Sequence, residues 1–357
     1  MNMKVIGTLA VAALIGTTAA CGSSDSNGGG SSADAASVYA KYAQMTPAQR
    51  DSELAKLAKD EGGKLTIYTD YSNEAPIAKA FGDKYGIDVT VYAPDNETLI
   101  QKLEQEESAG HHSADVLDST YPFVTEAADK SLLYPGWKPA ATYGEVTSDS
   151  WYPTRFVAWA TSWNTDEVQD SDLPDTIDGL ADPKWKGKLA MEVGDYDWYA
   201  AILQYLQKDR GMSEDQAEQT MQKIADNSVP MKGHTAIAQA VISKQVLVSP
   251  TTYIQNIIEQ QPAPISWQSD SGKYVAPVVL GPAGIGLLNH APDPAAAMLY
   301  ADYILSEEGQ QALEDAGSTP GDLKLAGLDD ETTVYPPVKD LLSSTKYQDA
   351  YQKLLGE

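Results

Sequence analysis

The sequence predicts an α/β fold with parallel strands. Strand-like and helix-like segments alternate from residue 65 onward, which is the pattern of βαβ units with right-handed crossovers. The chain has 357 residues, a length that suggests two domains or one large one. No period of about 20–50 residues recurs, which argues against a solenoid.

The first βαβ unit is predicted over residues 65–91. Residues 65–69 alternate apolar and polar side chains like a strand. Ser72 or Asn73 can then cap a helix, and Gly86 stands where that helix would stop. Residues 87–91 alternate again as a second strand. A polar helix over 47–59 precedes this unit.

The same alternation continues along the chain. Asn96 can cap a helix over 99–103, and Asp293 with Pro294 can start one that runs to Leu305. The region 275–288 is rich in Val, Leu and Gly and predicts buried strands. Further strands are predicted at 114–117, 155–160 and 189–192, and further helices at 198–208, 214–225 and 254–260.

The composition excludes several classes of function. The chain carries 25 Lys and Arg against 51 Asp and Glu, a formal charge of −26. Nucleic acids and anionic lipids are bound through Lys and Arg, so neither is an expected partner. The single cysteine excludes an intrachain disulfide and a CxxC pair. Twenty Tyr and seven Trp against three Phe suit half-buried surfaces such as clefts.

The N-terminus is predicted to be an export signal. A basic start is followed by an uncharged apolar run to residue 20, which is too short for a comfortable membrane span. Thr18-Ala19-Ala20-Cys21 resembles the lipobox of bacterial lipoproteins, in which the cysteine is lipidated. We therefore predict a signal peptide over 1–20, lipidation of Cys21 and a flexible tether over 21–36. The alternative is an ordinary signal that happens to carry a cysteine.

An ordered set of short stretches resembles a known family, the extracellular solute-binding lipoproteins of bacterial ABC importers. The resemblance is to the ferric-iron-binding branch, with a type II periplasmic-binding-protein-like fold. The matching stretches are 58–68, Ala80-Phe81 with 85–89, 114–116, Asn164-Thr165, 182–188, 233–235 and 291–310.

This resemblance implies two α/β lobes, each a mostly parallel sheet flanked by helices, joined by crossover strands, with a ligand between them. We place the N-lobe at 37–155 plus 276–320 and the C-lobe at 156–275. Residues 321–357 are expected to form C-terminal helices that dock on the C-lobe. The implied role is delivery of a captured solute to an ABC permease from the outer face of the cytoplasmic membrane, by a monomer.

Turns at the carboxyl ends of strands are the expected ligand-binding positions. Helix N-termini there present unpaired N–H groups, although simple helix capping explains Ser, Thr and Asp equally well. The excess of Tyr and Asp favours a site. The candidate ligand-binding residues are Tyr68, Ser72, Asp118, Ser119, Thr120, Trp163, Asp195, Tyr196, Asp197, Trp198, His234, Thr235 and Tyr253.

The identity of the ligand stays open between a metal and an organic molecule. The iron-binding relatives use tyrosine phenolates, and hard oxygen ligands suit a hard cation. Tyr196, Tyr253, Asp118 and His234 are the candidate ferric ligands, with iron as cargo rather than cofactor. Those relatives commonly carry adjacent tyrosines, whereas here Ile254 follows Tyr253. A phosphonate, polyamine or carboxylate is the alternative, with Trp163 and Trp198 either stacking on it or packing in the core.

An enzyme is not expected. The sequence contains no GxSxG elbow, P-loop, HExxH, or GxGxxG after a strand. A secreted hydrolase with two carboxylates is the alternative from another class, because 51 acidic residues always offer pairs. His111 and His112 suggest a metal site, but their Ser/Ala/Gly context predicts a solvated loop.

Overall fold

The computed structural model describes residues 34–139, 141–144, 148–329 and 331–356. The predicted signal peptide, Cys21 and most of the predicted tether lie outside these residues. Residues 32–357 form one compact unit, and the description concerns that unit. Among the described helices, none combines the length and apolar character needed to cross a bilayer.

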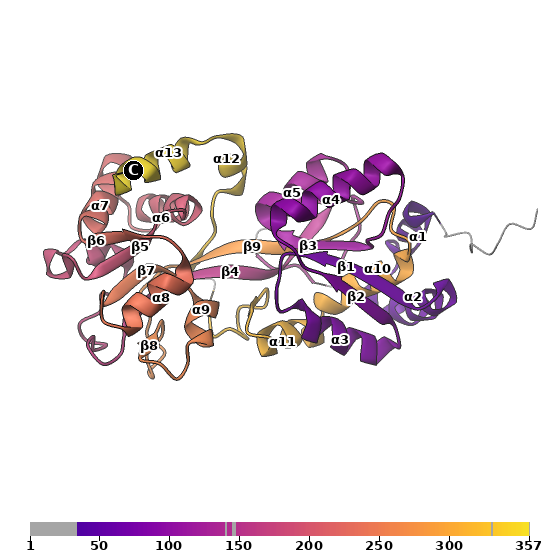
Figure 1. Ribbon diagram of the computed structural model, residues 1–357, viewed down its shortest axis with the longest axis horizontal. Helices are drawn as coiled ribbons and strands as arrows, with labels where there is room; N and C mark the ends of the chain where they lie inside the picture. Colours follow the sequence, from indigo (N-terminus) through magenta and orange to yellow (C-terminus); the bar gives the residue numbers. More distant parts are fainter. Residues whose placement is uncertain (1–33, 140, 145–147, 330, 357) are drawn as a thin grey trace, which may run out of the picture. The chain divides into compact units, whose positions relative to one another are not determined.

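One group of strands, here called the N-lobe sheet, contains three parallel strands in the order β2-β1-β3. Helices from both ends of the chain pack around them (Figure 1). The elements of this lobe are α1 (Ala35–Tyr42), α2 (Pro47–Glu61), β1 (Lys64–Thr69), α3 (Glu74–Tyr85), β2 (Asp88–Tyr92), α4 (Asn96–Ala109), β3 (Val116–Thr120), α5 (Tyr121–Asp129), α10 (Pro294–Ile304), α11 (Glu307–Asp315) and β10 (Thr319–Pro320).

The second group, the C-lobe sheet, has β5 paired in parallel with both β6 and β7. Its elements are two 3₁₀ turns (Ile177–Ala181 and Pro183–Trp185), β5 (Leu189–Glu192), α6 (Tyr196–Lys208), α7 (Glu214–Asp226), β6 (Ser228–Met231), α8 (His234–Ile242), β7 (Val248–Tyr253), α9 (Ile254–Glu259) and β8 (Ile265–Ser266).

Two long strands connect the groups: β4 (Trp151–Asn164) and β9 (Val278–Leu287). They pair antiparallel with each other (Figure 1). Residues 283–287 of β9 also pair with β3, while residues 159–163 of β4 pair with β7. Both strands are almost entirely buried. The strand order β2-β1-β3-β9-β4-β7-β5-β6 therefore runs through both lobes.

The two lobes have separate hydrophobic cores. One is built on α10, which is buried along its whole length, together with Phe81, Tyr300 and Tyr303. The other gathers Trp163, Trp185 and Trp198 around β5 and helices α6 and α7. Burial of such large apolar surfaces is the main stabilising term of each lobe.

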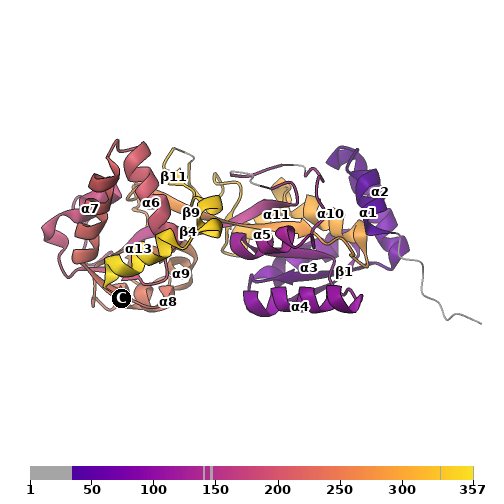
Figure 2. The same cartoon turned by 90° about the horizontal axis from the view of Figure 1, so that it is seen from above.

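The C-terminal segment contains β11 (Thr333–Val334), α12 (Val338–Ser343) and α13 (Lys346–Leu355). Helix α13 packs against α6 and α7 (Figure 2), whereas α12 contacts α5. The buried Tyr351 of α13 donates a 2.6 Å hydrogen bond to the carbonyl of Glu192 at the end of β5. The last helix thus supports the backbone at a strand end of the C-lobe.

Most predicted elements are confirmed, including β5 at 189–192 and the helix ended by Gly86, whose φ of 69° favours glycine. Three details were wrong. Asp95, not Asn96, caps α4, because its carboxylate accepts the Thr98 N–H at 2.9 Å. The region 275–288 contains one continuous strand, Val278–Leu287, rather than several. Helix α1 begins at Ala35, inside the segment assigned to the tether.

Candidate functional site

Three side chains of types that can bind a metal ion converge at the strand ends of the C-lobe sheet. Glu192 ends β5, Asp195 stands at the N-cap of α6, and His234 is the first residue of α8. One ligand atom from each lies within 4.8 Å of the others. We call these three residues the C-lobe cluster. The ends of parallel strands and the starts of the following helices bring them together, as expected for a ligand site in an α/β sheet.

Backbone hydrogen bonds hold Glu192 in place. Its carboxylate accepts the N–H of Gly233 at 3.0 Å and also the N–H of Gly194. Its own N–H donates to the Thr251 hydroxyl at 2.9 Å. Glu192 therefore joins the turns that precede α6 and α8, the two helices that carry Asp195 and His234.

The hydrogen bonds of His234 define its tautomer. Its Nδ1 lies 3.0 Å from the carbonyl oxygen of Thr251. Because a carbonyl can only accept, Nδ1 carries a proton. Nε2 then faces Asp195, 3.4 Å from its Oδ1. This arrangement, with Nδ1–H bonded to a carbonyl and Nε2 directed toward a carboxylate, is one that orients a histidine for metal binding through Nε2.

Aromatic rings cover one side of the C-lobe cluster. The Tyr253 ring stacks on His234 with centroids 3.4 Å apart and planes 24° from parallel. Trp159 meets Tyr253 edge-on at 5.2 Å. Asp195 Oδ2 and the indole nitrogen of Trp159 are both buried and form no hydrogen bond of standard geometry among the described residues, although the indole N–H acts on Asp195 and lowers its pKa. A buried carboxylate oxygen without a well-formed hydrogen bond is costly unless a ligand satisfies it.

Burial raises the proton affinity of the acids in this region. The pKa of Asp195 is raised to about 6, because burial outweighs the favourable contact with His234. The pKa of Asp197 is raised to about 7 by burial and by the nearby Asp195. For His234, burial lowers the pKa, but the hydrogen bond and charge of Asp195 outweigh it, so the pKa is raised. Burial and three acidic neighbours raise the pKa of Tyr253 well above its ordinary value.

The N-lobe presents a different cluster, centred on the buried Arg155 of β4. One guanidinium nitrogen donates to Asp118 in the middle of β3, and another donates to Asp70 at 2.9 Å. The guanidinium lies 4.6 Å from the centre of the Tyr71 ring. Asp118 also accepts from the Thr154 hydroxyl at 3.0 Å. We call Arg155, Asp70 and Asp118 the arginine cluster. Its charges are largely compensated within the protein.

A cavity of about 290 Å³ adjoins the arginine cluster and also touches the C-lobe. Asp70, Ser72 and Thr120 contribute to its wall from the N-lobe, and Tyr253 and Gln255 from the C-lobe. Tyr121, the first residue of α5, lies close enough to Asp197 and Tyr196 that burial and these two groups raise its pKa. Residues of both lobes thus meet beside Tyr253.

The predicted site residues separate into groups. Asp195, Tyr196, Asp197, His234 and Tyr253 lie together at the C-lobe strand ends. Ser119 and Thr120 support the arginine cluster, because the Ser119 hydroxyl and the Thr120 N–H both donate to Asp70, at 3.0 and 2.8 Å.

Other predicted residues have different surroundings. Tyr68 faces α4, where its hydroxyl donates to Glu106 at 2.8 Å. Trp163 and Trp198 are buried in the C-lobe core. Thr235 accepts a hydrogen bond from Asn256 at 3.3 Å on the exposed side of α8. The oxygens of Asp118 are engaged by Arg155 and Thr154.

The sequence analysis did not single out several residues of these clusters. Glu192 and Arg155 were assigned only to strands, and Trp159 and Tyr121 were not considered. One available signal was a lone charge in an otherwise apolar strand, as at Arg155 and Glu192, since buried charges are rarely tolerated without a partner. No local pattern marked Tyr121, because its role depends on contact with the other lobe.

Comparison with known proteins places the chain in a family. Residues 112–339 match the family described as "Bacterial extracellular solute-binding protein", which is more than half of the chain. The protein is a member of that family. The resemblance to extracellular solute-binding proteins stated from the sequence is thereby confirmed, and the family is one of binding proteins.

Solved structures show that this solute-binding protein has the type II periplasmic-binding-protein fold. Iron-bound HitA from Pseudomonas aeruginosa is 21% identical, with a TM-score of 0.59, covering 82% of this chain and 99% of its own. Ferric iron-binding protein A from Mannheimia haemolytica in an open conformation is 16% identical, with a TM-score of 0.61 over 82% and 98%. The spermidine/putrescine-binding protein PotD from Streptococcus pneumoniae is 15% identical, with a TM-score of 0.62 over 82% and 98%.

Proposed function

We propose that this solute-binding protein captures a cation, with ferric iron as the favoured cargo, and delivers it to an ABC permease. The observation that carries the proposal is the C-lobe cluster. It places two carboxylates and one imidazole within 4.8 Å of each other, beside the phenol of Tyr253 and the acid Asp197. Hard oxygen ligands and imidazole suit an iron ion.

The charges around Tyr253 explain why a strongly charged cation fits best. The charged groups that act on its hydroxyl are Asp195, Asp197 and Glu192, all of which oppose loss of its proton. A phenolate at this position therefore needs a compensating positive charge from the ligand. A ferric ion supplies that charge and allows the phenolate to become a ligand.

Asp195 replaces Asp118 in the proposed ligand set. Asp118 is committed to Arg155 and Thr154, whereas Asp195 has a buried oxygen that forms no hydrogen bond of standard geometry among the described residues. The proposed ferric ligands are therefore His234 through Nε2, Asp195 and Tyr253. Tyr196, at the start of α6, is the candidate for a second phenolate.

The test is the visible absorption of the protein titrated with ferric nitrilotriacetate. Phenolate bound to ferric iron gives a charge-transfer band, so we expect a coloured complex. Tyr253→Phe keeps the ring stacked on His234 and removes only the donor oxygen, so it should abolish or shift the band. Tyr68→Phe is the matched control, because Tyr68 faces Glu106 on α4 and should leave the band unchanged. A colourless wild-type protein would contradict the iron assignment.

An organic cation, such as a polyamine, is the second candidate. It is favoured by the aromatic rings of Trp159, Tyr253 and Tyr121 next to Asp195 and Asp197. Aromatic faces and carboxylates are the groups that recognise ammonium ions. This candidate predicts no band but a spermidine-dependent rise in thermal midpoint. An anion such as a phosphonate or a carboxylate would have to approach uncompensated acids, which disfavours it.

We also propose that the protein is a monomer held at the outer face of the cytoplasmic membrane by a lipid on Cys21. The support is the Ala19-Ala20-Cys21 junction followed by a Gly/Ser-rich stretch. Cys21→Ala should release the protein into the medium or leave it unprocessed, while Ser24→Ala should not. Membrane retention and processing of Cys21→Ala at wild-type levels would refute lipidation.

A further inference from the structure

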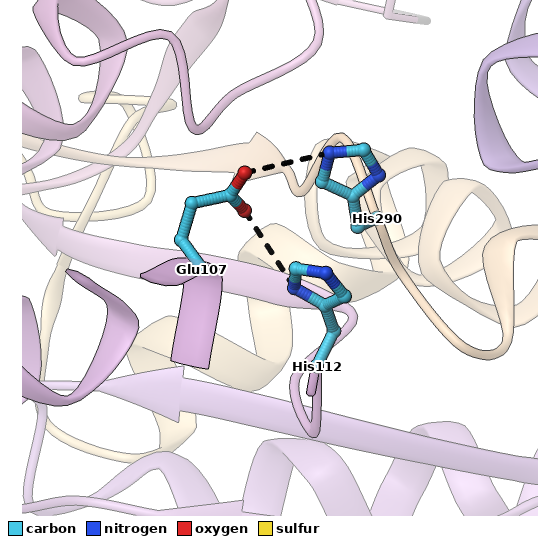
Figure 3. Close-up of side chains that lie close together, drawn as sticks. All are labelled: Glu107, His112 and His290. Atoms are coloured by element: carbon cyan, nitrogen blue, oxygen red, sulfur yellow. Dashed lines mark ion pairs between the residues drawn. The ribbon is translucent and has the colours of Figure 1, made fainter. Parts of the chain in front are cut away.

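We propose a second metal site on the N-lobe, formed by Glu107, His112 and His290, that binds a divalent transition-metal ion such as Zn²⁺. Figure 3 shows the three side chains directed toward one another. They come from the end of α4, from the loop before β3 and from the loop between β9 and α10. The inference is independent of the proposed cargo, because none of these residues belongs to the C-lobe cluster.

The distances between the ligand atoms suit a shared ion if the three side chains move slightly closer together. Glu107 Oε2 lies 3.6 Å from His112 Nδ1, and Glu107 Oε1 lies 3.6 Å from His290 Nε2. One ligand atom from each residue lies within 4.8 Å of the others. Zinc bonds of about 2.0–2.1 Å in tetrahedral geometry place ligand atoms roughly 3.3 Å apart. The side-chain shifts required are small.

The backbone presents the two histidines in defined positions. Before His112, the His111 N–H donates to the Glu106 carbonyl at 3.0 Å, and after it the Ser113 N–H donates to the Glu106 carboxylate at 3.2 Å. Before His290, the Asn289 side chain donates to the carbonyls of Ser131 and Leu133 at 2.7 and 3.2 Å. Loops held in this way lose little further freedom when a metal binds.

The chemistry of the three side chains favours zinc, copper or nickel over calcium or magnesium. Two imidazoles and one carboxylate are a ligand set typical of zinc, with further positions open to water. Glu107 and His290 are 45% and 56% exposed and His112 is 28% exposed, so an ion can reach them from solvent. The two imidazole rings already lie 4.6 Å apart. Residues 111–112 lie in a loop, as predicted. In addition, His112 belongs to the proposed metal site.

Metal binding here would connect two parts of the N-lobe. His112 precedes β3 and His290 follows β9, and these two strands pair antiparallel. An ion bound by both loops stabilises the native state by mass action, because the unfolded chain does not hold the three ligands together. The expected result is a zinc-dependent rise in the thermal midpoint of the protein.

The test is titration of the purified protein with Zn²⁺ by calorimetry, with the thermal midpoint as a second readout. Removing two ligands with His112→Asn/His290→Asn should weaken one zinc site by at least about tenfold and lower the stoichiometry by one. His111→Asn is the matched control and should bind zinc like wild type. Asp195→Asn in the C-lobe cluster should leave this site intact, which separates the present proposal from the proposed cargo site.

Three results would overturn the proposal: no zinc binding by wild type, unchanged binding by the double variant, or loss of all zinc binding in Asp195→Asn. The last result would assign the metal to the C-lobe cluster. Midpoints measured in chelator confirm that each variant is folded. If the double variant is destabilised, the single His290→Asn change at an exposed side chain provides the same comparison.

Discussion

The two lobes handle buried acidic charge in opposite ways. In the arginine cluster, Asp70 and Asp118 are paired with Arg155, which is 4% exposed. In the C-lobe cluster, Asp195 has His234 as its partner side chain, Glu192 accepts two backbone N–H groups, and Asp197 adds a further acid nearby. The first arrangement contains a permanent cation, while the cationic partner of the second among the described residues is the titratable His234.

This difference separates a structural role from a ligand-binding role. Carboxylates that are paired and hydrogen-bonded contribute to the folded state, and removing one partner is costly. Burial raises the pKa of Asp118 in the arginine cluster as well as those of Asp195 and Asp197. The two clusters differ in their partners, because Asp118 faces a permanently charged guanidinium and Asp195 faces an imidazole that can lose its proton. We therefore assign the cargo to the C-lobe cluster and stability to the arginine cluster.

The largest expected effect is that of Arg155→Met. The change removes the cation between Asp70 and Asp118 and leaves both carboxylates buried without it. We expect the free energy of unfolding to fall by about 3–5 kcal/mol, measured by urea denaturation. Lys186→Met, on an exposed turn, is the charge-matched control and should change stability by about 0.5 kcal/mol or less. If Arg155→Met and Lys186→Met lowered the free energy of unfolding equally, the arginine cluster would have no special role in stability.

A smaller, pH-dependent effect is expected for Asp197→Asn without ligand. The pKa of Asp197 is raised to about 7 in the native state, so the native protein binds this proton more tightly than the unfolded chain. Its contribution to stability is therefore present below about pH 4 and is lost progressively as pH rises from about 4, the ordinary pKa of the unfolded chain, to about 7. Asn cannot ionise, so the stability of the variant relative to wild type should increase from about pH 4 to about pH 7 and then level off, as followed by thermal midpoint in chelator. A variant that loses stability equally at both ends of this pH range would show that Asp197 supports the fold.

The sequence predicted which turns carry the candidate site residues better than it predicted which side chains contact each other. Strand ends and helix starts follow from local patterns, so Asp195, His234 and Tyr253 could be named as candidates from their turns. The pairing of Asp118 with Arg155 could not be predicted, because the two residues are brought together by sheet pairing between β3, β9 and β4. Similarly, Tyr68 lies within β1, the strand that Asp70 follows, but its side chain points to α4, and this direction depends on the face of the sheet.

The central claim, that the C-lobe cluster holds a cation, is tested most directly by calorimetric titration of wild type and Asp195→Asn with three probes: ferric nitrilotriacetate, spermidine and methylphosphonate. Asp195 has a buried oxygen that forms no hydrogen bond of standard geometry among the described residues, and a charge-assisted contact is worth about 1.5–3 kcal/mol. The account predicts that wild type binds a cationic probe, that Asp195→Asn binds it at least about tenfold more weakly, and that neither binds methylphosphonate. Binding of methylphosphonate to wild type, retained or strengthened in Asp195→Asn, would contradict the account.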